Sequence, residues 1–138
     1  MAARDIFHEA VKQALIKDGW TITHDPLFLP FGSIDLYVDL GAEKVIAAER
    51  AGRYIAIEVK SFLGSSLVSD FHTALGQFLN YRMVLETREP ERHLYLGVPS
   101  DTYTTFFTLP FAQLAIQRYQ LKLVIYDAEH EEITQWHD

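Results

Sequence analysis

Apolar residues recur at two spacings along the chain, one typical of helices and one typical of strands. In residues 5–18 they return every three or four positions, which predicts an amphipathic helix, and Gly19 stands where a glycine would end that helix. In residues 20–24 apolar and polar positions alternate, which predicts a short strand that ends at Asp25 and Pro26.

The middle of the chain predicts three more strands. Residues 34–40 alternate strongly, and residues 44–48 form a second extended stretch. Residues 53–62 return as a further strand after a hairpin turn at Ala51 and Gly52.

The second half of the chain alternates helices with buried strands. Residues 67–86 predict a helix, residues 93–98 a strand, residues 104–120 a region that is helical after Pro110, and residues 121–126 another strand. The main elements follow in the order α-β-β-β-α-β-α-β. This order predicts an α/β (α+β) fold with a mixed sheet of about five strands flanked by helices.

The composition is that of an ordinary globular domain. Its 138 residues are 49% hydrophobic and 22% charged, which suits one domain over residues 1–138. The absence of Cys excludes disulfides, Cys-ligated zinc, iron–sulfur clusters and thiol nucleophiles. No apolar run approaches the roughly 20 residues of a membrane span, and the first residues include Glu and His where a secretory signal would be apolar. We therefore expect a cytoplasmic protein with no membrane partner.

The net charge bears on any role with DNA. The chain carries 12 Lys and Arg against 19 Asp and Glu, a formal charge of −7. Proteins that hold DNA by themselves neutralise its phosphates with a basic face. We therefore expect weak binding to bare DNA. The charge still permits DNA contact through a partner protein, and it permits a cluster of carboxylates that holds a cation.

The candidate chemistry lies in residues 53–62. Ile55, Ile57 and Val59 would bury one face of this strand, so Glu58 and Lys60 would point together to the other face. Such a pair suits metal-assisted phosphodiester hydrolysis, because a carboxylate helps to hold Mg²⁺ or Mn²⁺ and an ammonium stabilises developing negative charge. Taken alone, the pair is more often an ion pair on a solvated face.

The position of this pair in the chain adds to the argument. It lies in the third strand of the order, after a strand that is rich in Asp. In this respect the chain resembles the PD-(D/E)XK nuclease superfamily over its whole length, which implies a restriction-endonuclease-like core. The Pro-Asp that opens the superfamily's motif is missing, since Asp25 and Pro26 stand in the reverse order.

Three acids are candidates to complete the site. Asp39 looks most like the first Asp of the superfamily motif and precedes Glu58 by 19 residues. The simple hairpin register instead sets Glu43 opposite Lys60, unless a bulge brings Asp39 back into place. Asp35 is better explained as an exposed strand residue.

Two outlying residues are further candidates. Similar nucleases bring a Glu of the first helix to the metal, which favours Glu9; the alternative is a solvated carboxylate paired with Lys12 or Gln13. Related resolvase-like nucleases place a Gln on the helix after the motif, which favours Gln77; the alternative is a surface amide. The predicted catalytic residues are Asp39, Glu58 and Lys60, the predicted ligands of Mg or Mn are Asp39, Glu43, Glu58 and Glu9, and Gln77 is a supporting residue.

Several stretches in combination resemble the XisH family. They are residues 4–8, 18–23, 35–43, 47–49, 57–62 and 71–78, and the resemblance runs from about Arg4 to Trp136. These cyanobacterial proteins are named as controlling factors for excision of the fdxN element. The resemblance implies a role in programmed DNA rearrangement, with a XisI-family protein and a large site-specific recombinase as partners. A divalent-metal DNA endonuclease is the alternative function.

Overall fold

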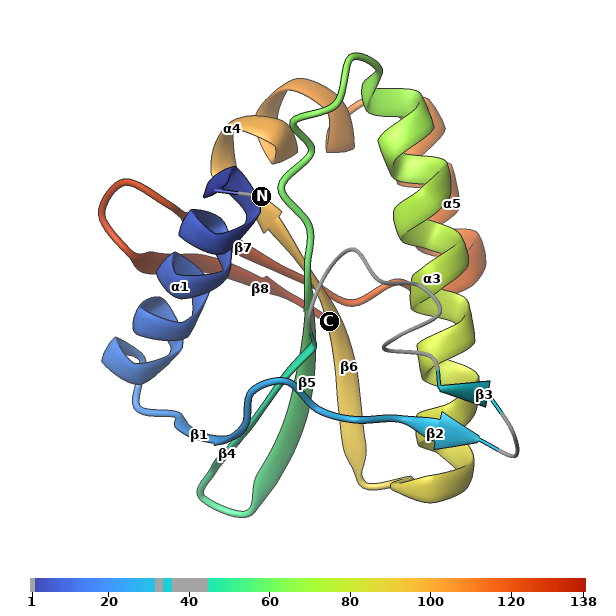
Figure 1. Ribbon diagram of the computed structural model, residues 1–138. Coiled ribbons are helices and arrows are strands. Elements are labelled where there is room, and N and C mark those ends of the chain that lie inside the picture. Colours follow the sequence, from blue (N-terminus) through green and yellow to red (C-terminus); the bar gives the residue numbers. More distant parts are fainter. Residues whose placement is uncertain (1, 32–33, 36–44) are drawn as a thin grey trace.

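A six-stranded sheet forms the centre of the protein, in the strand order β1-β4-β5-β6-β7-β8. The computed structural model describes the backbone of residues 2–31, 34–35 and 45–138, and the side chains of residues 7–29 and 46–138. Helix α1 (Ala2–Lys17) covers one face of the sheet, and α3 (Leu67–Arg88) and α5 (Pro110–Tyr119) cover the other (Figure 1). The predicted α/β class, a mixed sheet flanked by helices, is confirmed.

The sheet is mixed because hairpins and crossovers alternate along the chain. Strands β5, β6 and β7 run parallel, and the remaining pairs are antiparallel. The strands are β1 (Thr21–His24), β4 (Val45–Arg50), β5 (Arg53–Val59), β6 (Arg92–Pro99), β7 (Leu123–Asp127) and β8 (Glu132–His137). Between β6 and α5 the chain forms a short helix, α4 (Ser100–Thr102), and one π-helical turn, η1 (Tyr103–Phe107).

The hairpin between β4 and β5 has the predicted register. Ala51 and Gly52 both have positive φ angles, 51° and 81°, which is the geometry of the two-residue turn that matches the twist of the strands. The ladder runs from the pair nearest the turn, Arg50 with Arg53, to Val45 opposite Glu58. The predicted pairing of Lys60 with Glu43 lies outside the described residues.

Two strands differ from the prediction. The sheet has six strands, not about five, because β8 pairs with β7 at one edge. Its residues are mostly half-exposed or exposed, so they lack the apolar alternation by which a strand is predicted. Of the predicted strand over residues 34–40, the described part is β3 (Ile34–Asp35), which pairs with β2 (Pro30–Phe31) in a separate two-stranded sheet.

Each face of the sheet has its own apolar core, so the central strands are buried on both sides. The core beneath α1 includes Val11, Leu15, Ile46, Ile55, Ile57, Val59, Tyr95 and Tyr126. The core beneath α3 and α5 includes Ala56, Phe71, Ala74, Phe78, Leu96, Phe107 and Ile125. Within the described part of the chain, no helix combines the length and apolar character that spanning a membrane requires.

An aromatic contact joins the residue just before β1 to the last strand. The rings of Trp20 and Trp136 lie 5.6 Å apart between centroids. Both indole N–H groups donate to the same carboxylate oxygen, Oδ2 of Asp18, at 3.2 and 3.3 Å. The segment that follows α1 is therefore fixed against β8, across 118 residues of sequence.

Candidate functional site

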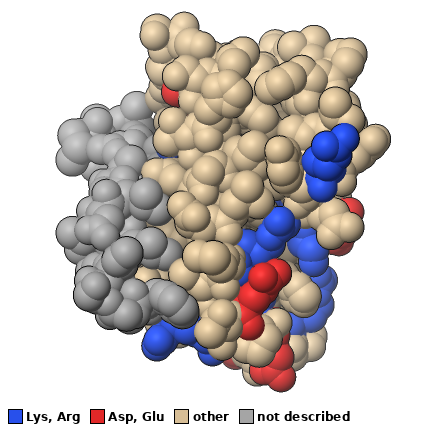
Figure 2. Space-filling view, turned by 90° about the vertical axis from the view of Figure 1, so that its right-hand side faces the viewer, with Lys and Arg blue, Asp and Glu red and all other residues tan. Residues whose placement is uncertain are grey.

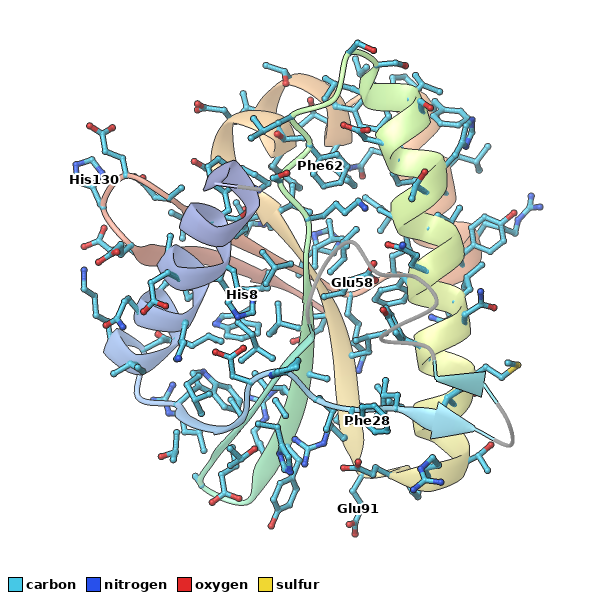
Figure 3. The ribbon with its side chains drawn as sticks, in the orientation of Figure 1. His8, Phe28, Glu58, Phe62, Glu91 and His130 are labelled. Carbon is cyan, nitrogen blue, oxygen red and sulfur yellow. The ribbon has the colours of Figure 1, made fainter. Side chains whose placement is uncertain are left out.

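Glu58 and Lys60 lie on the α3 face of the sheet, at the carboxyl end of β5. Ile57 belongs to the core beneath α1 and Ala56 to the core beneath α3, so strand alternation turns Glu58 and Lys60 toward α3. Figure 3 shows Glu58 between β5 and α3. Glu58 is 0% exposed and Lys60 is 7% exposed, so this face is not solvated and an exposed ion pair does not explain the two residues.

The structure brings Gln77 to Lys60. Lys60 Nζ donates to Gln77 Oε1 at 3.4 Å, a long hydrogen bond, and Gln77 is 8% exposed. Gln77 lies on the buried side of α3, between Ala74 and Phe78, and is not a surface amide. Lysines are seldom buried without a polar partner, and ionisable groups held in buried positions concentrate at functional sites. Glu58, Lys60 and Gln77 therefore place polar groups inside the interface between the sheet and α3.

Two backbone contacts fix the end of β5 where Lys60 stands. The Lys60 N–H donates to the carbonyl of Gly97 at 3.2 Å, and the hydroxyl of Tyr126 donates to the Lys60 carbonyl at 3.2 Å. Gly97 allows a close approach here, because a Cβ would lie 3.1 Å from Cγ2 of Ile57. Tyr126 is 66 residues from Lys60 and no motif surrounds it, so its contact with this strand end could not be predicted from the sequence.

The connection from β5 to α3 sets the rotation of the helix that carries Gln77. Phe62 has a positive φ of 55°, which turns the chain after the strand. Ser66 caps the helix by accepting from the Ser69 N–H at 3.2 Å, as its residue type at a helix start predicts. Asp70 in the first turn of the helix accepts from the Gly64 N–H at 2.9 Å. These contacts fix the start of α3.

Within the described part of the chain, no other predicted metal ligand lies beside Glu58. Glu9 is exposed, and its carboxylate accepts from Gln13 Nε2 at 3.0 Å, one of the two alternatives stated for it. It lies on α1, which packs on the face of the sheet opposite Glu58. Asp39, Glu43 and the side chain of Asp35 lie outside the described residues. The distances from these acids to Glu58 are therefore not described.

The fit of a metal ion to these residues is therefore partial. Glu58 supplies one buried carboxylate, the oxygen ligand that Mg²⁺ and Mn²⁺ prefer. Among the described residues there is no group of three or more His, Asp or Glu side chains that could hold an ion. The metal site thus depends on Asp39 or Glu43, and the Mg or Mn cofactor stays a prediction.

A separate charged cluster lies on the α1 side. Asp25 accepts from Lys12 Nζ at 3.0 Å, and its other oxygen lies 2.6 Å from His8 Nε2. Partial burial acts to raise the pKa of Asp25, but the hydrogen bonds from Lys12 and His8 outweigh it and hold the pKa below its usual value. The hydrogen bond with Asp25 likewise raises the pKa of Lys12. This cluster ties α1 to the segment after β1.

The family follows from comparison with known proteins. The family model described as XisH protein matches residues 1–134. The chain belongs to the XisH family. The resemblance drawn from the sequence motifs is thereby confirmed.

Two crystal structures are similar to this XisH-family chain over nearly its whole length. An XisH family protein from Nostoc punctiforme PCC 73102 is 56% identical, with a TM-score of 0.90, over 97% of this chain and 100% of the other. An fdxN element excision controlling factor protein from Anabaena variabilis is 54% identical, also with a TM-score of 0.90, over 97% of this chain and 99% of the other. No protein with a curated description matches the chain.

Proposed function

We propose that this XisH-family chain is a controlling factor for the programmed excision of a DNA element of the fdxN type. The observation that carries the proposal is the 54% identity, over 97% of the chain, with the Anabaena variabilis protein described by that role. The chain acts together with a site-specific recombinase and a XisI-family companion. Its charge of −7 suits a protein that works through such partners and does not bind DNA tightly by itself.

A reconstituted excision assay tests this role. A plasmid carrying a DNA element between its recombination sites is combined with the recombinase and the XisI-family companion, with and without this chain. The excised circle is detected by amplification across the rejoined ends. We expect circles only when the chain is present; equal excision without it would contradict the proposal.

The second candidate is a divalent-metal DNA endonuclease with a restriction-endonuclease-like core. It is favoured by the burial of Glu58, Lys60 and Gln77 together at the end of β5. Glu58 would hold the ion with Asp39 or Glu43, and the ion would polarise the phosphate and activate a water. Lys60 would stabilise the negative charge that develops on the phosphate, and Gln77 would keep the lysine in place.

A nicking assay separates this candidate from the first. Supercoiled plasmid is incubated with the protein and Mn²⁺, and we expect nicking that both Glu58→Gln and Lys60→Met abolish. Glu91→Gln serves as the control, because Glu91 is an exposed acid in the turn before β6, far from Glu58 (Figure 3). Activity that persists in Glu58→Gln would contradict the nuclease function.

The excision assay with Glu58→Gln then links or separates the two functions. Loss of excision together with loss of nicking would mean that control requires cleavage. Excision that persists in a variant unable to nick would leave the control role intact without the site.

A further inference from the structure

An apolar groove runs between the outer sides of α3 and α5, which lie next to each other on one face of the sheet (Figure 1). The groove has a volume of about 330 Å³, and its lining includes Leu75 of α3 and Phe111, Leu114 and Tyr119 of α5. Both helices also bury a different side against the sheet. The groove is therefore a second apolar surface, which the described part of the fold does not cover.

Large apolar side chains stay exposed along this groove. On α5, Leu114 is 58% exposed, Phe111 53% and Tyr119 43%. The neighbouring side of α3 carries a stripe with spacings of four, three, four and four residues, formed by Val68, His72, Leu75, Leu79 and Met83. Adjoining exposed apolar side chains on two helices are typical of a surface that binds another molecule.

The surface around the groove is almost uncharged, although 22% of the chain is charged. Within the fully described stretch from Leu67 to Met83, no exposed residue is Asp, Glu, Lys or Arg, and the described α5 exposes one charged side chain, Arg118. Figure 2 looks onto this side of the molecule; charged side chains gather over its lower half, and most of the upper half is free of them. Interfaces between proteins are depleted in Lys, Asp and Glu and enriched in aromatic residues, Met and Arg, so this composition favours a protein partner.

The aromatic ring of Phe111 is held in place before any partner arrives. It packs edge-on against the buried ring of Phe71, with 6.0 Å between centroids, and against His72, with 6.4 Å. An exposed side chain that its neighbours already position loses little freedom on binding. Phe111 can therefore act as a fixed anchor in the groove.

Arg118 supplies the charge of the groove. It lines the groove beside the apolar residues of α5, and among the described residues its guanidinium has no ion pair and no hydrogen bond. Arg82 differs, because its Nη1 donates to the carbonyls of Tyr119 and Gln120 at 2.9 and 3.1 Å. No described acid lines the groove. A carboxylate is the group that best complements a free guanidinium, so the partner should bring one.

We infer that this groove binds an amphipathic helix of another protein, whose apolar residues contact Phe111 and Leu114 and whose Asp or Glu pairs with Arg118. A groove between two helices accepts a third helix that carries apolar residues three and four positions apart. The charge of −7 does not prevent this pairing, because at physiological salt charges beyond about 8 Å are largely screened. The inference does not depend on the proposed function or on Glu58.

A second copy of this chain is a poorer occupant. In a symmetric dimer the same surface of both copies forms the interface. Each copy would then bring Arg118 to the interface, and neither groove is lined by a described acid to pair with it. Charge complementarity therefore favours a different protein.

Fluorescence anisotropy with three labelled synthetic peptides tests the inference. The acidic peptide is a helix former with leucines three and four positions apart and one Glu beside them. The basic peptide has Lys in place of that Glu, and the scrambled peptide has the composition of the acidic one without the leucine spacing. We expect the acidic peptide to bind most tightly, the basic peptide more weakly and the scrambled peptide not at all.

Three variants locate the binding. Leu114→Gln should weaken binding of the acidic peptide about tenfold or more, which is about 1.4 kcal/mol. Because Leu114 is more than half exposed, the variant should stay folded, which circular dichroism checks. Ile16→Gln is the matched control, since Ile16 is an exposed aliphatic residue on α1, across the sheet from the groove. Arg118→Glu should reverse the preference, so that the basic peptide binds more tightly than the acidic one.

The outcomes separate the inference from its rivals. Binding that Leu114→Gln weakens, Ile16→Gln leaves unchanged and Arg118→Glu redirects to the basic peptide would support it. No binding of the acidic peptide up to about 1 mM, an equal loss in Ile16→Gln, or an unchanged preference in Arg118→Glu would overturn it. Sedimentation that shows a wild-type dimer, dissociated by Leu114→Gln, would also overturn it, since a second copy would then occupy the groove.

Discussion

The response of Glu58→Gln to Mn²⁺ is the most informative test of the candidate metal site. An ion that binds only the folded chain stabilises it by about 2.7 kcal/mol at a hundredfold excess over its dissociation constant. The unfolding entropy of a 138-residue protein is about 0.3 kcal/mol per kelvin, so the melting temperature of the wild type would rise by about 9 °C. Gln keeps the shape of the fully buried Glu58 side chain but removes the charge that a hard cation needs, so we expect no rise in the variant.

Melting is followed by far-ultraviolet circular dichroism, with and without Mn²⁺, for wild type, Glu58→Gln and the control Glu91→Gln. Without metal, we expect Glu58→Gln to melt close to wild type, since it also removes one of the carboxylates predicted to crowd the site. The reasoning would fail if Mn²⁺ left wild type unchanged while Glu58→Gln strongly destabilised the metal-free protein. Glu58 would then act as a structural partner of buried Lys60, and its loss would leave a buried charge uncompensated.

Three further predictions address the support of the site, the charged cluster at α1 and the binding of DNA. Tyr126→Phe keeps the ring but leaves the Lys60 carbonyl without this donor, so urea unfolding should show a loss of about 1 to 3 kcal/mol, and an unchanged stability would argue against the hydrogen bond. Because Lys12 and His8 hold the pKa of Asp25 low against the effect of burial, its contribution to stability is present above about pH 4 and is lost as the pH falls through the lowered value. Asp25→Asn should therefore flatten the stability of the protein between neutral and acid pH, as measured by urea unfolding at several pH values, whereas an unaltered acid sensitivity would contradict this. Fluorescence anisotropy should show weak binding to a bare DNA duplex at physiological salt, and tight binding with a steep salt dependence would disprove the inference from the charge of −7.

The β4–β5 hairpin illustrates what local sequence determines. A two-residue turn at Ala51 and Gly52 restricts the pairing of its strands, and the observed pair of Val45 with Glu58 has the register that would set Glu43 opposite Lys60. The period of two along β5 likewise predicts that Glu58 and Lys60 share a face. The same register cannot choose between Asp39 and Glu43, because a bulge changes the alignment by a residue.

Helix α3 illustrates what required the structure. Phe71, Ala74, Phe78 and Leu85 recur at helical spacing in the sequence and are buried in α3, and Gln77 is buried among them. The apolar spacing thus predicts the buried side of the helix, but it gives no reason to expect a polar residue such as Gln77 on that side. The reason for the exception is Lys60, whose ammonium needs a partner in the interface. The hydrogen bond from Tyr126 to Lys60 was equally beyond prediction, since it depends on the order of parallel strands.

The contact between Trp20 and Trp136 gives the protein a built-in optical reporter. These are the two tryptophans of the chain, and their rings lie 5.6 Å apart, close enough for their excited states to interact. Emission and near-ultraviolet circular dichroism of the native protein thus report whether β8 has docked beside the segment that follows α1. During synthesis Trp136 emerges long after Trp20, so the surface of Trp20 stays uncovered until the last strand joins the sheet. Stopped-flow fluorescence would therefore time the closure of this edge without any added label.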